Sequence, residues 1–172
     1  MAELNPGKIV TGKVRLSYVN VFTPMERENG DPRYSCAILI PKTDTATVEK
    51  FNKAFEDIKN DPKSLAKWGQ SNKGVRGGLR DGDEEKDDPA YAGHYFINAN
   101  SAQKPGVVDA DLQPVIDPSE VYSGCYGRAS VTLFAYNMAG AKGIGCGLNN
   151  IQKLEDGERL GGGTSAEQDF AI

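Results

Sequence analysis

Small apolar residues alternate with aromatic and polar residues over positions 122–137, YSGCYGRASVTLFAYN. Successive side chains of a β-strand point to opposite faces of a sheet, so this period of two predicts a strand with one buried face. The odd positions from Ser123 to Ala135 are small or aliphatic and suit a core. The even positions should face solvent, yet they include four rings and a guanidinium: Tyr122, Tyr126, Arg128, Phe134 and Tyr136. A solvent face with this many rings indicates either a covering segment or a ligand.

Four further segments have strand patterns. Residues 8–22 alternate polar and apolar side chains, which predicts a long strand bent near Gly12 or Tyr18. Residues 33–41, RYSCAILIP, predict a buried strand that forms a hairpin with the first. Strand character returns at 92–101, AGHYFINANS, and at 143–154, GIGCGLNNIQKL. In the first strand we expect one face to carry Val10, Val14 and Leu16 and the other to carry Thr11, Lys13, Arg15 and Ser17.

Residues 43–60 have the period of a helix. Its apolar positions are Val48, Phe51, Phe55 and Ile58, with Asp44 as the N-cap and Asp61-Pro62 as the stop. The sequence PKSLAKWG, 62–69, predicts a short second helix whose Trp68 packs on the strands. Residues 70–89 turn to glycine and charge and predict a long mobile loop. The proline-rich connection 100–121 contains one short extended piece.

Five principal strands with one intervening helix suit a small barrel better than a sandwich, which needs about seven strands. We therefore predict a mainly β fold, an OB-like five-stranded Greek-key barrel with one inserted helix, long loops and a flexible acidic C-terminal tail. The barrel domain should span 1–154, with a mobile basic and acidic loop at 70–89, and the tail should span 155–172. Barrels of this type bind oligonucleotides on one exposed face and its loops.

Composition and charge refine this picture. The 172 residues are 38% hydrophobic and 26% charged, which fits one soluble domain. No apolar run reaches the roughly 20 residues of a membrane span, and the start lacks the features of a secretory signal. The net charge of −4 is uneven: residues 1–80 hold 14 Lys and Arg against 9 Asp and Glu, whereas residues 81–88 hold 1 against 6. A near-neutral to basic body thus carries an acidic insertion and an acidic tail, which permits a nucleic-acid partner.

Rings and cations on one surface suit single-stranded DNA, because bases stack on aromatic side chains and basic side chains follow the phosphates. The strand at 122–137 supplies most of the rings, and the first strand, the glycine-rich loop and the third strand supply the rest. The candidate DNA-binding residues are Lys13, Arg15, Arg76, Arg80, His94, Phe96, Tyr122, Tyr126, Arg128, Phe134 and Tyr136.

These residues also have structural interpretations. The rings could form a second small core under the helix or the 100–121 connection, although a buried Arg128 would then need a partner. His94 could be a hydrogen-bonded structural residue, and the basic loop could be merely solvated. The three cysteines are widely spaced and indicate buried residues rather than disulfides or a zinc site. One histidine, with carboxylates concentrated in loops and tail, leaves no catalytic constellation, so we expect no enzyme and no cofactor or metal.

The acidic C-terminal segment suggests a docking role. A mobile negative tail could compete with DNA for a basic groove and offer an aromatic side chain to a partner's pocket. The residues expected to dock are Glu167, Asp169 and Phe170. The alternative is a tail that only increases solubility.

Four blocks of the sequence together resemble a known family. They are LRDGDEEK, YAGHYFINANS, YSGCYGRASVTLFAYN and KGIGCGLNNIQKLEDGERLGG, and they extend over most of the chain. The chain is similar to the single-stranded-DNA-binding proteins of tailed phages and prophages, formerly a domain of unknown function. The resemblance implies an OB-fold protein that coats single-stranded DNA during phage replication or recombination and has an acidic C-terminal tail. The end of this chain, AEQDFAI, is less acidic than that pattern and does not end on its aromatic residue.

Two functional hypotheses follow. The first is a non-enzymatic protein of the host cytoplasm that binds and protects single-stranded DNA without regard to sequence, with replication or recombination proteins as possible partners and no membrane partner. The second is a structural protein, such as a virion component, that uses the aromatic strand as a subunit interface. A homodimer is compatible with the first hypothesis, whereas an oligomer that buries Tyr126 and Tyr136 is required by the second.

Overall fold

Five strands pair in a ring in the computed structural model, which describes residues 7–26 and 32–160. Four of the links are antiparallel: β7 with β2, β2 with β3, β3 with β5, and β7 with β8. The fifth link, between β5 and β8, is parallel and rests on the single pair Asn100 and Gly147. The strands are β2 (Val14–Met25), β3 (Arg33–Pro41), β5 (His94–Ser101), β7 (Tyr126–Met138) and β8 (Ala141–Glu155).

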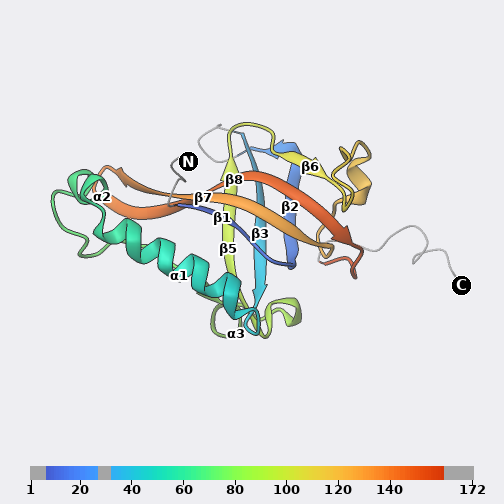
Figure 1. Cartoon of the computed structure of the whole chain (residues 1–172), viewed down its shortest axis with the longest axis horizontal. Coiled ribbons are helices and arrows are strands. Elements are labelled where there is room, and N and C mark those ends of the chain that lie inside the picture. Colours follow the sequence, from blue (N-terminus) through green and yellow to red (C-terminus); the bar gives the residue numbers. More distant parts are fainter. Residues whose placement is uncertain (1–6, 27–31, 161–172) are drawn as a thin grey trace, which may run out of the picture.

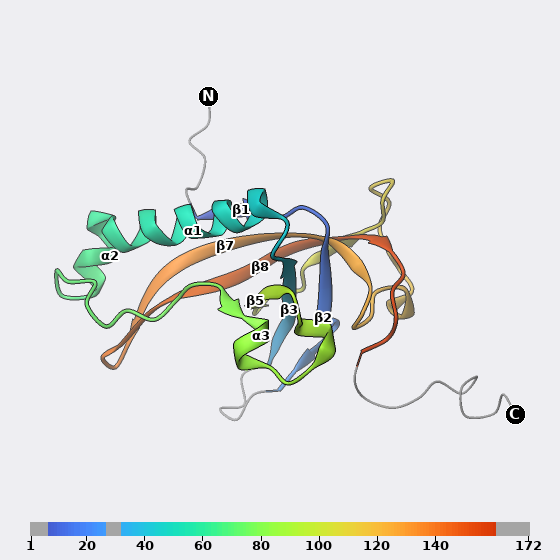
Figure 2. The same cartoon turned by 90° about the horizontal axis from the view of Figure 1, so that it is seen from below.

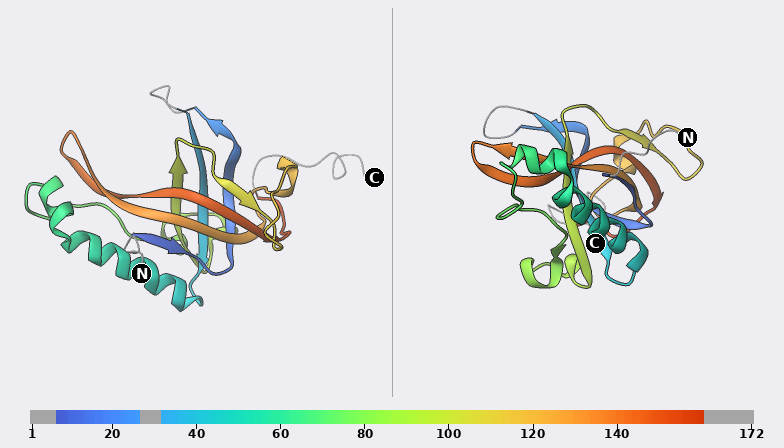
Figure 3. Two further views of the ribbon diagram at one scale, coloured as in Figure 1. Left: turned by 45° about the horizontal axis from the view of Figure 1, so that its top comes forward. Right: turned by 60° about the vertical axis from the view of Figure 1, so that its left-hand side comes forward.

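Three short strands extend this ring. β1 (Lys8–Val10) pairs with β7, β6 (Gly106–Val108) pairs with β8, and β4 (Arg80–Asp81) pairs with β5. The predicted mainly β, OB-like architecture is confirmed: the strands form one eight-stranded sheet in which β7, β2, β3, β5 and β8 are neighbours in that order. The β7–β8 hairpin extends well beyond the other ring strands (Figures 1 and 3).

The helices follow the predicted positions. α1 (Thr45–Asn60) begins after Asp44, whose Oδ1 accepts a hydrogen bond from the backbone N–H of Thr47 at 3.2 Å. α2 (Pro62–Lys67) starts on its proline, as expected. α1 runs alongside β7 and buries Phe51, Phe55 and Ile58 in the main core (Figures 1 and 2). Within the described residues, no helix is long and apolar enough to cross a membrane.

Trp68 joins α2 to the hairpin. Its side chain is 1% exposed, and its Nε1–H donates to the backbone oxygen of Tyr136 at 2.9 Å. A buried indole needs such a partner for its N–H group. The expected packing of Trp68 on the strands is confirmed, and this contact fixes the helices against the far half of β7.

The first strand is broken where a bend was expected, but its faces differ from the prediction. β1 ends at Val10 and β2 begins at Val14. Val10 is 40% exposed while Ile9 is buried, and Thr11 and Ser17 are buried rather than solvent-facing. Because the strand is interrupted, the residues before and after the break do not continue a single alternation of buried and exposed side chains. Within the break, Thr11 Oγ1 accepts a hydrogen bond from Ala129 N–H at 3.0 Å. Tyr18, the other predicted bend, has a φ of 48°.

The segment expected to be a loop at 70–89 contains regular structure. It includes β4 and a helical turn, α3 (Gly82–Glu85), and a 3₁₀ turn at Pro89–Tyr91 follows it. Asp81 caps α3 by accepting from Asp83 N–H, which the sequence pattern did not reveal. The extended piece expected within 100–121 is β6, and a second 3₁₀ turn occupies Pro118–Glu120.

The boundaries of the strand predicted at 122–137 and of the tail predicted at 155–172 also differ from the prediction. β7 begins at Tyr126, four residues later than the alternation suggested, because Tyr122–Cys125 turn at Gly124 with a φ of 115°. β8 continues to Glu155. Leu160 N–H then donates to Ser123 O at 2.9 Å, so the first residues of the predicted tail contact the barrel.

Candidate nucleic-acid interface

The two faces of β7 separate as the alternation predicted. Gly127, Ala129, Val131, Leu133 and Ala135 are buried, and the intervening side chains face outward. We call the outward set the outer face of β7; it consists of Tyr126, Arg128, Ser130, Thr132, Phe134 and Tyr136. Phe134 is 47% exposed and lies 6.4 Å from Tyr136 between ring centroids. Two neighbouring rings are therefore accessible on an otherwise polar surface.

Alternate glycines of β8 make room for these rings. Gly145 pairs with Phe134, and Gly143 pairs with Tyr136. A Cβ atom on Gly145 would lie 2.6 Å from Cζ of Phe134, and one on Gly143 would collide with the Tyr136 hydroxyl. The rings thus lie across the glycine backbone, an arrangement in which an aromatic side chain covers a strand glycine. Ring packing therefore explains the alternate glycines of GIGCG.

Cations surround Tyr126 at the other end of β7. Lys13 Nζ lies 5.2 Å from the ring centroid, and the Arg15 guanidinium carbon lies 5.4 Å from it. Arg15 donates to Gly124 O at 3.1 Å and to Glu158 O at 2.8 Å. Lys13 forms an ion pair with Glu155. Lys13 and Arg15 therefore share the surface with Tyr126, as expected, although each is already engaged within the protein.

Two further predicted arginines lie along the same surface. Arg128 is exposed, and its Nε–H donates to Thr11 O at 2.9 Å. Arg76 forms an isolated parallel β-bridge with Gly143, and its backbone N–H donates to Lys142 O at 3.1 Å. Residues paired in this way project to the same side, so Arg76 extends the outer face beside Tyr136. The glycine-rich segment is thus a partner of β8.

Three predicted residues lie elsewhere, on the side of β5 that faces away from the main core. Phe96 is only 1% exposed, because Tyr91 packs on it at 5.2 Å and the Arg80 guanidinium lies 4.9 Å from its ring. Arg80 is paired with Glu85 at 2.9 Å. His94 Nδ1 is 2.8 Å from Ala92 O. Phe96 cannot stack on a base in this arrangement, and the structural interpretation of His94 is favoured.

Acidic residues hold the segment that covers Phe96. Lys42 Nζ lies 2.8 Å from both Asp81 and Asp83, and its hydrogen bonds lower the pKa of each carboxyl group. The same two carboxylates raise the pKa of Lys42. The acidic block of the sequence therefore neutralises the cations Lys42 and Arg80 on this side of β5.

Tyr122 is removed from the stacking surface by the chain that follows β8. Its hydroxyl accepts from Gly157 N–H at 3.0 Å, and the Arg159 guanidinium lies 4.5 Å from its ring centroid. The expected position on a strand face was wrong, because β7 starts after this residue. The predicted docking residues Glu167, Asp169 and Phe170 lie outside the described residues.

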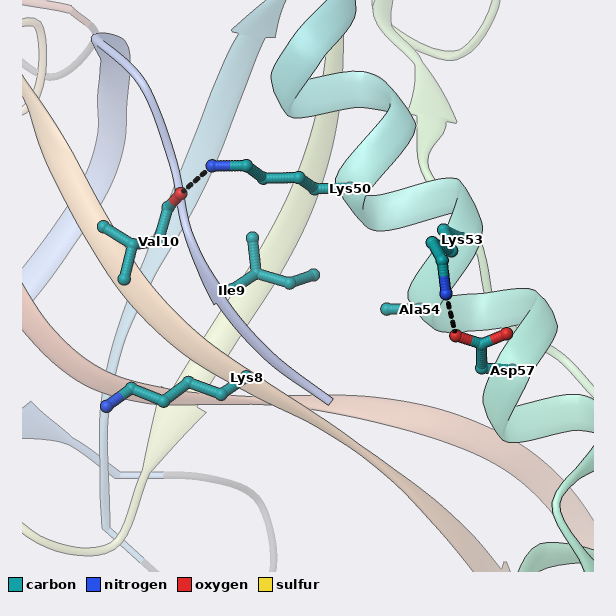
Figure 4. Close-up of a pocket in the computed structure, with 7 residues that line it drawn as sticks. All are labelled: Lys8, Ile9, Val10, Lys50, Lys53, Ala54 and Asp57. Carbon is teal, nitrogen blue, oxygen red and sulfur yellow. Dashed lines mark hydrogen bonds and ion pairs between the residues drawn. The ribbon is translucent and has the colours of Figure 1, made fainter. Parts of the chain in front are cut away.

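Sequence reasoning missed the contribution of β1. Lys8 pairs with Thr132, and Val10 pairs with Ser130, which places both on the outer face of β7. A hollow of about 440 Å³ separates β1 from α1; there Lys50 Nζ donates to Val10 O at 3.2 Å, and Lys8 points away from the helix (Figure 4). The bend predicted at Gly12 could have indicated this, because the alternation of faces must be read separately on each side of an interruption.

The cysteines behave as buried apolar residues. Burial raises the pKa of Cys36 to about 12 and also raises the pKa of Cys125 and Cys146. Thiols with a raised pKa are poor nucleophiles and poor metal ligands. Across residues 7–26 and 32–160, no group of three or more metal-ligating side chains comes together.

Comparison with known proteins gives a consistent set of matches. Residues 7–172 match the family described as the ssDNA-binding protein of Enterobacter phage Enc34. A putative protein, p50, of Acyrthosiphon pisum secondary endosymbiont phage 1 is 30% identical, with 95% of this chain and 92% of that protein covered.

Solved structures share the fold. The single-stranded DNA-binding protein from bacteriophage Enc34, in complex with ssDNA, matches with a TM-score of 0.79 at 24% identity over 94% of this chain and 97% of that chain. The single-stranded DNA-binding protein gp2.5 of bacteriophage T7 matches with a TM-score of 0.62 at 14% identity, over 95% of this chain and 93% of that one.

Proposed function

We propose, from the premise that this chain belongs to the family of the ssDNA-binding protein of Enterobacter phage Enc34, that it binds single-stranded DNA on the outer face of β7. The relative solved in complex with ssDNA supports the ligand, and the surface of β7 supports the location of the site. The single observation that carries the place is the pair of neighbouring rings beside cationic side chains, the exposed Phe134 and the half-buried Tyr136. Such rings accept the faces of any of the bases, so binding is independent of sequence.

Cations along this face would hold the phosphates. Three cations lie on the surface that carries the rings. Lys8 comes from β1, Arg76 from the segment paired with β8, and Arg128 from β7 itself. Lys13 and Arg15 extend the cationic surface past Tyr126. Their contacts with phosphate supply affinity that does not depend on base identity.

The biological role follows from this chemistry. The protein would coat and protect single strands during phage DNA replication or recombination, in the host cytoplasm, without catalysis or a cofactor. Glu167, Asp169 and Phe170 keep their proposed role of docking replication or recombination proteins. A homodimer would be compatible with this function if its interface leaves the outer face of β7 accessible.

A salt titration tests the function. A labelled single-stranded oligonucleotide should bind at low salt, and log affinity should fall linearly with log salt at a slope of about −0.7 for each phosphate neutralised. If three or four cations contact phosphates, the slope should be about −2 to −3. Fluorescence anisotropy at several salt concentrations measures this slope, with a duplex of matching sequence as the control.

Duplex binding should be much weaker, because paired and stacked bases cannot lie on Phe134 and Tyr136. Equal affinity for both forms would contradict stacking. No binding at any salt concentration, together with an oligomer that buries Tyr126 and Tyr136, would instead establish the subunit-interface hypothesis.

A further inference from the structure

A second hollow, of about 100 Å³, lies on the outer face of β7 at Arg128 and Ser130. Val10 of β1 pairs with Ser130 of β7, and Val108 of β6 pairs with Gln152 of β8. Since β7 and β8 are neighbours, the two valines flank the hollow from opposite sides. Pockets for drug-sized ligands measure about 300–1,000 Å³, so this one suits a single small ring.

The polar group whose orientation is best determined is the amide of Asn150. Its Oδ1 accepts a hydrogen bond from Gly106 N–H at 3.1 Å. A backbone N–H needs an acceptor, and this fixes which end of the amide faces β6. The Nδ2 group has no partner among the described residues, so Asn150 offers the hollow a hydrogen-bond donor.

Gln152 and Arg128 complete the set. Gln152 Nε2 donates to Asp109 O at 3.4 Å, which leaves its Oε1 as an acceptor. Arg128 uses Nε for Thr11 O, and its two Nη groups have no partner within the part of the chain that the structure describes. The hollow is therefore lined by these two donor groups, one acceptor and two valine side chains, together with the hydroxyl of Ser130, which accepts from Asn149 Nδ2 at 3.5 Å.

We propose that this hollow binds one thymine base of the DNA strand. The pairing edge of thymine presents two carbonyl oxygens with an N–H between them, which complements two donors and an acceptor. Its methyl group is the base substituent that apolar side chains contact. Cytosine has the same ring size but presents an amino group in place of one carbonyl oxygen. The Nδ2 group of Asn150 would then meet another hydrogen-bond donor, and no hydrogen bond could form.

The position is compatible with the stacking rings. Ser130 precedes Phe134 by four strand residues, or about 13 Å at the usual rise of a strand. A DNA strand that lies along β7 would reach the hollow within a few nucleotides of the rings. The inference rests on the proposed function and adds a local preference to an otherwise sequence-independent surface.

The test compares oligothymidine and oligocytidine of equal length by anisotropy at one salt concentration, using the full chain. The wild-type protein should bind oligothymidine about 5-fold more tightly, the low end of the discrimination given by a base-edge contact. Asn150→Asp keeps the acceptor for Gly106 N–H and replaces the donor with a second acceptor. The preference should then disappear or reverse towards cytosine.

Asn149→Asp is the matched control for the added charge, because Asn149 is the neighbouring residue in the chain but does not line the hollow. Its Nδ2 donates to Thr132 Oγ1 at 2.9 Å and to Ser130 Oγ at 3.5 Å. This variant should lower the affinities for oligothymidine and oligocytidine by the same factor, so that the ratio of the two affinities stays at the wild-type value. A wild-type ratio of one, or the same ratio in Asn150→Asp and wild type, would overturn the thymine site while leaving single-strand binding intact. Failure to bind either oligonucleotide would overturn the proposed function and the thymine site together.

Discussion

Phe134→Ala is expected to lower the affinity for single-stranded DNA roughly 5- to 150-fold, because a base stacked on an aromatic ring contributes about 1–3 kcal/mol. The ring is 47% exposed and rests on the backbone of Gly145, so it is both accessible and held in place. The salt slope should stay near the wild-type value, since no cation is removed. Anisotropy titration with one oligonucleotide at several salt concentrations measures both quantities.

Tyr18→Ala provides the control for this prediction. Tyr18 is 63% exposed and lies on β2, outside the outer face of β7, so its removal deletes an exposed ring from another surface. Its affinity should match the wild type. If Phe134→Ala binds as the wild type does while both variants remain folded by circular dichroism, the outer face of β7 is not the stacking surface.

Trp68→Ala is expected to reduce the free energy of unfolding by about 3–5 kcal/mol, the usual cost of truncating a buried tryptophan. The indole is 1% exposed and donates its N–H to Tyr136 O at 2.9 Å. Both the apolar contacts and this hydrogen bond would be lost. For a chain of this size, the midpoint of thermal unfolding should fall by roughly 10 °C.

The neighbouring Lys67 supplies a matched comparison. Its side chain is exposed, and its Nζ donates weakly to Ala135 O at 3.4 Å. Lys67→Ala should change the midpoint by no more than about 2 °C, since surface substitutions usually change stability by less than 0.5 kcal/mol. If the midpoint of thermal unfolding of Trp68→Ala also lies within about 2 °C of the wild-type value, Trp68 does not anchor α2 to the hairpin.

Local patterns predicted most of the elements. The strand Arg33–Pro41 has the predicted limits, because a continuous apolar run is bounded by a turn sequence and a proline. α1 starts after Asp44 and ends at Asp61-Pro62, since capping and proline chemistry depend on nearby residues alone. The buried and outward faces of β7 were also predictable from their period of two.

Tertiary contacts decided what the sequence did not reveal. Phe96 has the same strand pattern as an exposed ring, but Tyr91 folds over it from a segment that looked like a loop. The ion pairs of Lys42 with Asp81 and Asp83 hold that segment, and no local pattern connects residues about forty positions apart. The position of Tyr122 was wrong for a similar reason, because its partners come from beyond β8.

The glycines of β8 show how one strand depends on another. GIGCG has no packing pattern of its own, and its alternate glycines gain a reason only when Phe134 and Tyr136 are placed across them. A larger residue at Gly145 would displace the Phe134 ring. The stacking surface is therefore built by two strands, although only one of them carries the rings.

The central claim is the location of DNA on the outer face of β7, and photo-cross-linking tests it most directly. An oligonucleotide carrying a photoreactive thymine analogue would be irradiated in complex with the full chain, and the cross-linked peptides would be identified by mass spectrometry. We predict cross-links to Phe134 or Tyr136. Cross-links confined to Tyr18, Tyr34 or Tyr95 would contradict the account and place the DNA on β2, β3 and β5 instead.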